Sequence, residues 1–189
     1  MHLFINTIPE VSTYILFDSK RIIQDRKTLT LKGHESEQFL ATLEGFLSDN
    51  NLTFAELKGI IVVNGPGSFT AMRIVTLTVN TLAFVHKTPL YSLDFFSLAV
   101  LAGLDYPMLM KANRGEYLLR KSEKDPPAII PIGEVPSGHY AGLGDTNDFT
   151  NGGISIQSEL DYGAAIRNLA LDTPTQRIDP FYIKKPNIT

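Results

Sequence analysis

The stretch 59–74, Gly-Ile-Ile-Val-Val-Asn-Gly-Pro-Gly-Ser-Phe-Thr-Ala-Met-Arg-Ile, carries the clearest structural signal in this sequence. Its unbroken apolar run at 59–63 is typical of a β-strand that is covered on both faces. Gly65 and Gly67 allow a tight turn after the strand, and Ser68 is a suitable N-cap for a helix expected over about 68–87. A strand, a glycine turn and a long helix in this order predict an α/β protein.

The glycine turn has two interpretations. Exposed amides at the start of a helix can bind an anion, so a phosphate-binding loop is the first. The second is a capped strand-to-helix connection that needs no ligand. The lysine of a Walker loop and the spacing of a dinucleotide fingerprint are both missing, so the residues favour the connection and leave the anion site open.

Apolar spacing in the rest of the chain predicts the order of the other elements. The expected strands lie at 3–5, 14–17, 21–31, 59–64 and 89–92, with short strands within 105–150, and the expected helices lie at 35–49, 68–87, 94–103 and 162–170. This order is typical of a ribonuclease-H-like half, residues 1–104, followed by a smaller degenerate copy, residues 105–189. Together they predict an actin-like duplicated α/β fold with a reduced second half.

Composition and charge limit the possible functions. The 189 residues carry a net charge of −3, with a pI near 5.8, which argues against a protein that binds nucleic acid by itself. Cysteine is absent, which excludes disulfides, thiolate catalysis and zinc–thiolate sites. The N-terminus does not resemble a signal peptide, and no run approaches the roughly 18 apolar residues that span a bilayer. We therefore expect a cytoplasmic protein without a membrane segment.

The glycine turn and the helix start resemble the signature of the TsaB (YeaZ) family, Gly-Pro-Gly-Ser-Phe-Thr-Gly-Leu-Arg-Ile-Gly. The chain keeps residues 65–70, Arg73 and Ile74, and it differs at Ala71, Met72 and Val75. Three shorter segments agree in order and spacing. Residues 6–7 (Asn-Thr) stand where the family has Asp-Thr, residues 113–117 resemble its Ala-Arg-Arg-Gly-Glu-Val-Tyr segment, and residues 180–184 resemble its closing Pro-x-Tyr-Leu-Arg.

This resemblance implies a role in tRNA modification. TsaB is a non-catalytic relative of TsaD, the catalytic subunit that places threonylcarbamoyl on N6 of adenosine-37 of tRNA. The resemblance implies that the chain pairs with a TsaD-like subunit, works with a TsaE-like ATPase and meets tRNA only through the complex. It also implies no cofactor of its own, with ATP or ADP and metal on the partner subunits. A free-standing homodimer with a regulatory role is left open.

Two catalytic alternatives are an actin-fold ATPase and a metal-dependent endopeptidase. The four histidines lie more than 30 residues apart, so the sequence has no helical His-x-x-x-His metal motif. Ser68 does not stand in a Gly-x-Ser-x-Gly nucleophile motif. Asn6 occupies the place of the aspartate with which actin-like ATPases hold Mg²⁺, and an amide supplies no full negative charge. We therefore expect no catalytic and no metal-binding residue.

The outer faces of the helices at 35–49 and 68–86 are expected to bind the partner. The second helix is apolar nearly all round, so it is either enclosed within its domain or covered by another chain, whereas the stripe of the first fits a core equally well. The predicted partner-binding residues are Phe39, Leu43, Phe46, Ser68, Met72, Arg73, Val75 and Val79. The resemblance further implies that Asn6, Gly65, Gly67, Arg114 and Glu116 lie near a nucleotide at the junction of the two subunits.

Overall fold

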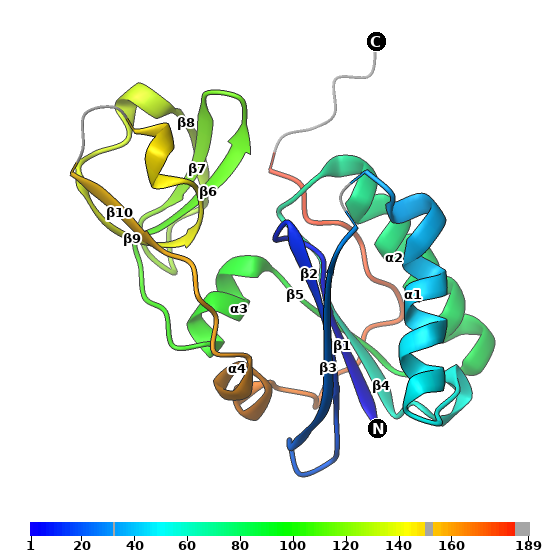
Figure 1. Cartoon of the computed structure of the whole chain (residues 1–189). Helices are drawn as coiled ribbons and strands as arrows, with labels where there is room; N and C mark the ends of the chain where they lie inside the picture. Colours follow the sequence, from blue (N-terminus) through cyan, green and yellow to red (C-terminus); the bar gives the residue numbers. More distant parts are fainter. Residues whose placement is uncertain (32, 150–152, 184–189) are drawn as a thin grey trace. The chain divides into compact units, whose positions relative to one another are not determined.

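The computed structural model describes residues 1–31, 33–149 and 153–183. It contains two five-stranded mixed β-sheets (Figure 1). The chain divides into two compact units, of which unit 1 comprises residues 1–95 and the described residues from 166 onward, and unit 2 comprises residues 96–165. This division differs from the expected boundary at 104/105, because the last segment of the chain returns to unit 1.

Unit 1 is built on a sheet with the strand order β3–β2–β1–β4–β5. Its first three strands form an antiparallel meander, and β4 and β5 run parallel to β1. The strands are β1 (His2–Asn6), β2 (Val11–Phe17), β3 (Ile23–Thr30), β4 (Gly59–Val63) and β5 (Leu90–Leu93). The crossover after β3 contains α1 (Glu35–Asp49) and the 3-10 turn η1 (Phe54–Glu56), and that after β4 contains α2 (Phe69–His86). This topology confirms the predicted ribonuclease-H-like half.

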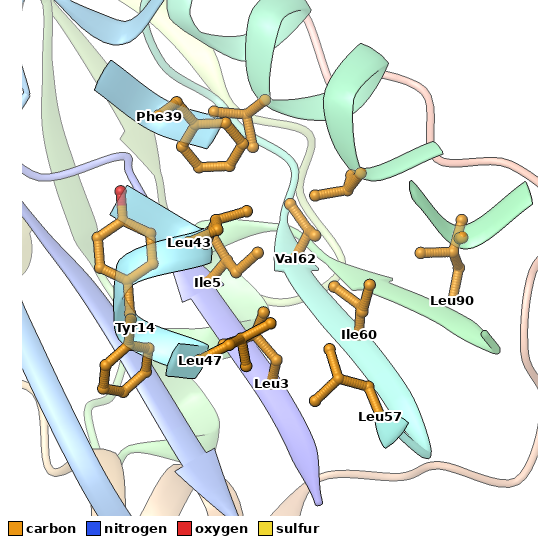
Figure 2. Close-up of a cluster of buried hydrophobic side chains, with 14 of the residues drawn as sticks. Leu3, Ile5, Tyr14, Phe39, Leu43, Leu47, Leu57, Ile60, Val62 and Leu90 are labelled. Atoms are coloured by element: carbon orange, nitrogen blue, oxygen red, sulfur yellow. The ribbon is translucent and has the colours of Figure 1, made fainter. Parts of the chain in front are cut away.

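The core of unit 1 lies between its sheet and the two long helices. Figure 2 shows Phe39, Leu43 and Leu47 of α1 beside Leu3 and Ile5 of the central strand β1. All five side chains are buried, and each contributes roughly 1.5–3 kcal/mol of transfer free energy. The apolar stripe of α1 therefore holds this helix to the sheet. Further members of the core come from the strands and from α2: Tyr14, Leu16, Phe46, Ile60, Val62, Val75, Val79 and Leu90.

Unit 2 repeats the topology of unit 1 in shortened form. Its strand order is β10–β9–β6–β7–β8, with an antiparallel β6–β7–β8 meander and with β9 and β10 parallel to β6. The 3-10 turns η2 (Ile132–Glu134) and η3 (Thr146–Asp148) stand where unit 1 has α1 and α2. The strands are β6 (Met108–Asn113), β7 (Glu116–Arg120), β8 (Ala128–Pro131), β9 (Gly138–Leu143) and β10 (Ile154–Gln157). The predicted reduced second half is thus confirmed.

One short helix follows the last strand of each sheet. α3 (Phe95–Leu101) comes directly after β5, and α4 (Tyr162–Asn168) comes after β10. They agree with the helices expected at 94–103 and 162–170, and each is shorter than expected at its carboxyl end.

Candidate functional site

The carboxyl ends of β1 and β4 lie side by side, because these strands are parallel neighbours. In open α/β sheets this edge is the usual place for a ligand. Asn6, the last residue of β1, is fully buried, and its Oδ1 accepts a hydrogen bond of 3.1 Å from the backbone amide of Ile8. The Asn6 side chain therefore stabilises the loop that follows its own strand.

The turn after β4 is shaped by contacts within the chain. Gly65 has a φ of +137°, and a Cβ atom at this position would collide with the carbonyl oxygen of Phe181. The Gly65–Pro66 peptide bond is cis, and the Gly65 carbonyl accepts a hydrogen bond of 2.7 Å from the Phe95 amide. Gly67 is exposed and lies beside Ile8. The close approach that requires glycine at 65 is thus made by the protein's own C-terminal segment.

Residues 175–182, here named the C-terminal strap, lie along β5 and α2. The Thr175 amide donates to the Leu90 carbonyl at 2.8 Å. The side chain of Asn80 on α2 holds both backbone polar groups of Ile178, donating to its carbonyl and accepting from its amide, each at 2.9 Å. The Ile178 side chain is only 1% exposed and joins the core of unit 1.

The strap then reaches the glycine turn. Asn64 donates from Nδ2 to the Asp179 carbonyl at 2.8 Å, and its own carbonyl accepts from the Phe181 amide at 2.7 Å. The ring of Tyr182 packs on Phe69 at a centroid distance of 4.9 Å. Of the closing family-like segment 180–184, residue 184 lies outside the described residues. The strap therefore occupies the edge of the sheet where the sequence leaves an anion site open.

Ser68 begins α2 as predicted. Its Oγ accepts a hydrogen bond from the Ala71 amide at 3.4 Å, and its carbonyl accepts from the Met72 amide at 2.9 Å. This N-cap accounts for the serine without a ligand.

Six of the eight predicted partner-binding side chains are core residues. Each is at most 1% exposed, so none can meet another chain, and this part of the prediction is wrong. They are Phe39, Leu43 and Phe46 of α1 and Met72, Val75 and Val79 of α2. The reason is that both apolar stripes pack on the sheet. Ser68 and Arg73 are exposed, as a partner contact requires.

The solvent side of α2 is also apolar. Leu77 is 69% exposed, Phe84 86% and Val85 63%. Their spacing from Arg73, at four, eleven and twelve residues, places them along one side of the helix. We call this side the outer face of α2; Thr70, Ile74 and Thr81 complete it, and Leu40 is an exposed apolar residue of the neighbouring α1. The sequence prediction did not include these exposed residues, and partner binding by α2 stays a prediction.

The length and composition of α2 would also allow it to cross a membrane, which differs from the expectation that no run is long enough. A third of this 18-residue helix is buried within the protein. A core helix of a soluble protein passes the same test, and the side of α2 toward the sheet is such a core.

Arg114 and Glu116, the other predicted nucleotide-proximal residues, lie in unit 2, in the hairpin between β6 and β7. Gly115 between them has a φ of +76°, which this tight turn requires. Arg114 is exposed, and Glu116 accepts a hydrogen bond of 3.0 Å from Nδ2 of Asn113. Their proposed nearness to a nucleotide stays a prediction.

A polar network that the sequence prediction missed joins β6, β7 and η3 in unit 2. The hydroxyl of Tyr117 donates to Asp148 at 2.7 Å, and Nζ of Lys111 forms an ion pair with the same carboxylate at 2.7 Å. Burial, together with the bond to this carboxylate, raises the pKa of Tyr117 to about 12. The bonds from Lys111 and Tyr117 lower the pKa of Asp148. These contacts hold the connection that follows β9.

The histidines have unlike surroundings. His2 stacks on Phe17 at a centroid distance of 5.1 Å, and burial lowers its pKa below 6.5, with further lowering by the N-terminal amine, Arg21 and Lys58. His139 contacts Ser155 through Nδ1 at 2.5 Å. Across the ranges 1–31, 33–149 and 153–183, no group of three His, Cys, Asp or Glu side chains is placed to hold a metal ion.

Comparison with protein families links the α1–α2 region to a tRNA-modifying enzyme. Residues 29–112 match the model of TsaD, described as tRNA N6-adenosine threonylcarbamoyltransferase. The tRNA N6-adenosine threonylcarbamoyltransferases of Listeria welshimeri and Listeria monocytogenes are 31% identical over 100 residues and 29% identical over 110 residues. These alignments cover 49% of this chain but only 29% and 32% of the relatives, so the chain spans about a third of their length.

Comparison with solved structures identifies the fold. The structure titled YeaZ from Pseudomonas aeruginosa matches with a TM-score of 0.60 and 16% identity, over 75% of this chain and 74% of that one. A second structure from the same organism, described as similar to peptidase YEAZ, gives the same values. The resemblance found at residues 65–74 is therefore upheld: the chain has the fold of YeaZ (TsaB) and carries, across α1 and α2, a segment related to the TsaD family.

Proposed function

We propose that this chain is a non-catalytic subunit that pairs with a TsaD-family transferase during the formation of threonylcarbamoyladenosine-37 in tRNA. The observation that carries this proposal is the apolar outer face of α2, with Leu77 and Phe84 largely exposed. This face belongs to the segment matched by the TsaD model. A TsaD-family chain is expected to carry an equivalent pair of helices, so two such pairs can pack against each other and cover both faces.

The edge of the first sheet supports the non-catalytic part of the proposal. The amide oxygen of Asn6 bonds within its own loop, and the strap engages Asn64 and lies against Gly65. The Asn6 side chain, the Asn64 side chain and the Gly65 carbonyl therefore already have partners within the chain. In this proposal ATP or ADP and the metal ion are bound by the partner subunits, including a TsaE-like ATPase, and the protein works in the cytoplasm.

The charge of the chain supports an indirect contact with tRNA. A net charge of −3 provides little attraction for a phosphate backbone, so tRNA is expected to be held by the assembled complex. The chain would then contribute by stabilising the active form of the transferase.

Reconstitution tests the proposal. tRNA threonylcarbamoylation is measured with the synthase, the TsaD-family subunit and the TsaE-like ATPase of the same organism, with and without this chain. Leu77→Glu introduces a charge in the centre of the outer face and is expected to abolish both pairing and modification. Ile22→Glu is the matched control, because Ile22 is 54% exposed in unit 1 but lies in the β2–β3 connection. Modification that proceeds equally well without the chain would exclude the proposed function.

Size-exclusion chromatography with light scattering separates a heterodimer from a homodimer. The proposal expects a new one-to-one or two-to-two species when the TsaD-family subunit is added, and no such species with Leu77→Glu. A dimer that forms from the chain alone and ignores the added subunit would instead favour the homodimeric regulatory protein.

A further inference from the structure

Arg73 is a cation among the apolar and threonine side chains of the outer face of α2. It lies on the outer face of α2, one helical turn before Leu77, and α2 contains no acidic residue. Within the part of the chain that the structure describes, no carboxylate lies within ion-pair distance of its guanidinium. A charge that is covered by a partner without a counter-charge is strongly unfavourable, so this position constrains which surface can bind here.

The guanidinium of Arg73 is held in place by aromatic rings. It lies over the ring of Phe69, 5.2 Å from the centroid, and Phe69 packs in turn on Tyr182 of the strap at 4.9 Å. A cation–π contact of this kind restricts the side chain before any partner arrives. Less conformational entropy is then lost when the guanidinium forms a bond across an interface.

Tyr182 is itself fixed by the strap. The backbone of Phe181 bonds to Asn64, and Asn80 of α2 holds Ile178. The strap is thereby joined to the same helix that carries the outer face.

We infer that Arg73 is the specificity residue of the outer face, and that it selects a TsaD-family partner presenting a carboxylate within an apolar helical surface. The strap acts as a positioning element, because Tyr182 supports Phe69 and Phe69 supports the guanidinium. This inference rests on the proposed function. A planar guanidinium can bind a carboxylate through two parallel hydrogen bonds, which gives a fixed register as well as attraction.

A second copy of the chain is the competing occupant. The exposed Glu37 and Glu44 of α1 offer carboxylates that the Arg73 of another molecule could meet. The TsaD-family chain is the occupant under the proposed function, and the experiment separates it from a second copy, which carries the same TsaD-related segment at residues 29–112.

The test is titration calorimetry of the full-length chain against the purified TsaD-family subunit of the same organism, at several salt concentrations. Arg73→Gln is expected to weaken binding about 30-fold, in the range found when one partner of a desolvated charge pair is truncated, and Arg73→Glu at least about 100-fold. Lys20→Glu is the matched control, because this exposed lysine undergoes the same charge change in the β2–β3 turn. The salt dependence of the dissociation constant should fall in Arg73→Gln and stay unchanged in Lys20→Glu.

The positioning role of the strap has its own readout. Tyr182→Leu removes the ring and is expected to weaken binding severalfold, whereas Tyr182→Phe keeps the ring and should bind like the parent chain. Equal binding by Tyr182→Leu would exclude the positioning role.

Each remaining outcome decides one claim. If Leu77→Glu abolishes binding while Arg73→Glu binds like the parent chain, the inference about Arg73 is wrong and the proposed function stands. If Leu77→Glu also binds normally, the proposed docking face is wrong. If the chain alone forms a dimer that Arg73→Glu dissociates, and the TsaD-family subunit does not bind, the occupant is a second copy.

Discussion

Asn80→Ala should release the C-terminal strap from α2. The Asn80 side chain forms two hydrogen bonds with the backbone of Ile178, both at 2.9 Å. Each contributes about 1 kcal/mol net, and the higher helix propensity of alanine returns about 0.5 kcal/mol, so the free energy of unfolding should fall by about 1.5 kcal/mol. With a urea m-value of about 2 kcal/mol/M, the unfolding midpoint should fall by about 0.75 M.

Two measurements check this prediction. Urea unfolding followed by circular dichroism gives the global effect, and hydrogen exchange at the Ile178 amide gives the local one. Exchange there should become about tenfold faster, since opening the strap becomes about 1.5 kcal/mol easier. Thr81→Ala is the control, because this exposed neighbour bonds only to the Leu77 carbonyl within α2. If Asn80→Ala matches Thr81→Ala in both measurements, the strap does not hold α2 as argued.

Three further substitutions test other parts of the structure. Gly65→Ala should destabilise unit 1 and make the C-terminal strap sensitive to protease, because its φ is +137° and a Cβ meets a strap carbonyl; Gly45→Ala, in open space within α1, should instead raise the unfolding free energy by about 0.5–1 kcal/mol in the same urea titration. His2→Gln should remove part of the loss of stability on acidification, measured by thermal melts at pH 5–8: the folded-state pKa of His2 is lowered, so the unfolded chain takes up the proton first and stability falls as pH drops below about 6.5. An unchanged pH dependence in His2→Gln would contradict this. Tyr117→Phe should lower the melting temperature, because it removes the hydrogen bond that the Tyr117 hydroxyl donates to Asp148 and leaves that carboxylate with the Lys111 ion pair; an unchanged melting temperature would contradict this.

Local sequence signals were sufficient for most of the secondary structure. The apolar run of β4, the glycine turn and the capping Ser68 specify a strand–turn–helix unit through residues that are neighbours in the chain. The change of apolar period at Glu35 likewise marked the start of α1. Order and type of elements then gave the fold, because few topologies accommodate a three-strand meander followed by two helical crossovers.

The course of the C-terminal segment was not predictable in the same way. Its bonds join Asn80 to Ile178 and Asn64 to Asp179, across separations of 98 and 115 residues. Such contacts leave no periodic pattern in either segment. The expected boundary at 104/105 therefore placed the strap in the second half of the chain, whereas in the structure it belongs to unit 1. The role of Gly65 was not predictable for the same reason. Glycine at a turn allows the close approach of either a phosphate or another backbone segment, and in the structure the backbone of the strap makes this approach.

The partner-binding residues were misassigned for a physical reason. In α2 apolar residues occupy nearly every position, so the sequence does not distinguish the side toward the sheet from the side toward solvent. Only the packed structure shows that Val75 and Val79 belong to the core and that Leu77 and Phe84 do not.

The presence of apolar residues on both sides of α2 also supports the proposed binding of a partner chain. A helix whose core side already holds it to the sheet gains nothing within the monomer from a leucine and a phenylalanine on its other side. Burying Leu77 and Phe84 against another chain would gain roughly 1.5–3 kcal/mol for each. Neighbouring charges cannot explain these residues either, because Arg73, one helical turn before Leu77, is a cation and α2 has no acid to pair with it. Exposed apolar side chains beside one guanidinium that is held by an aromatic ring are expected of an interface that needs both affinity and specificity. The two properties can be removed separately: Leu77→Glu should abolish affinity, and Arg73→Gln should remove the specificity that the guanidinium provides.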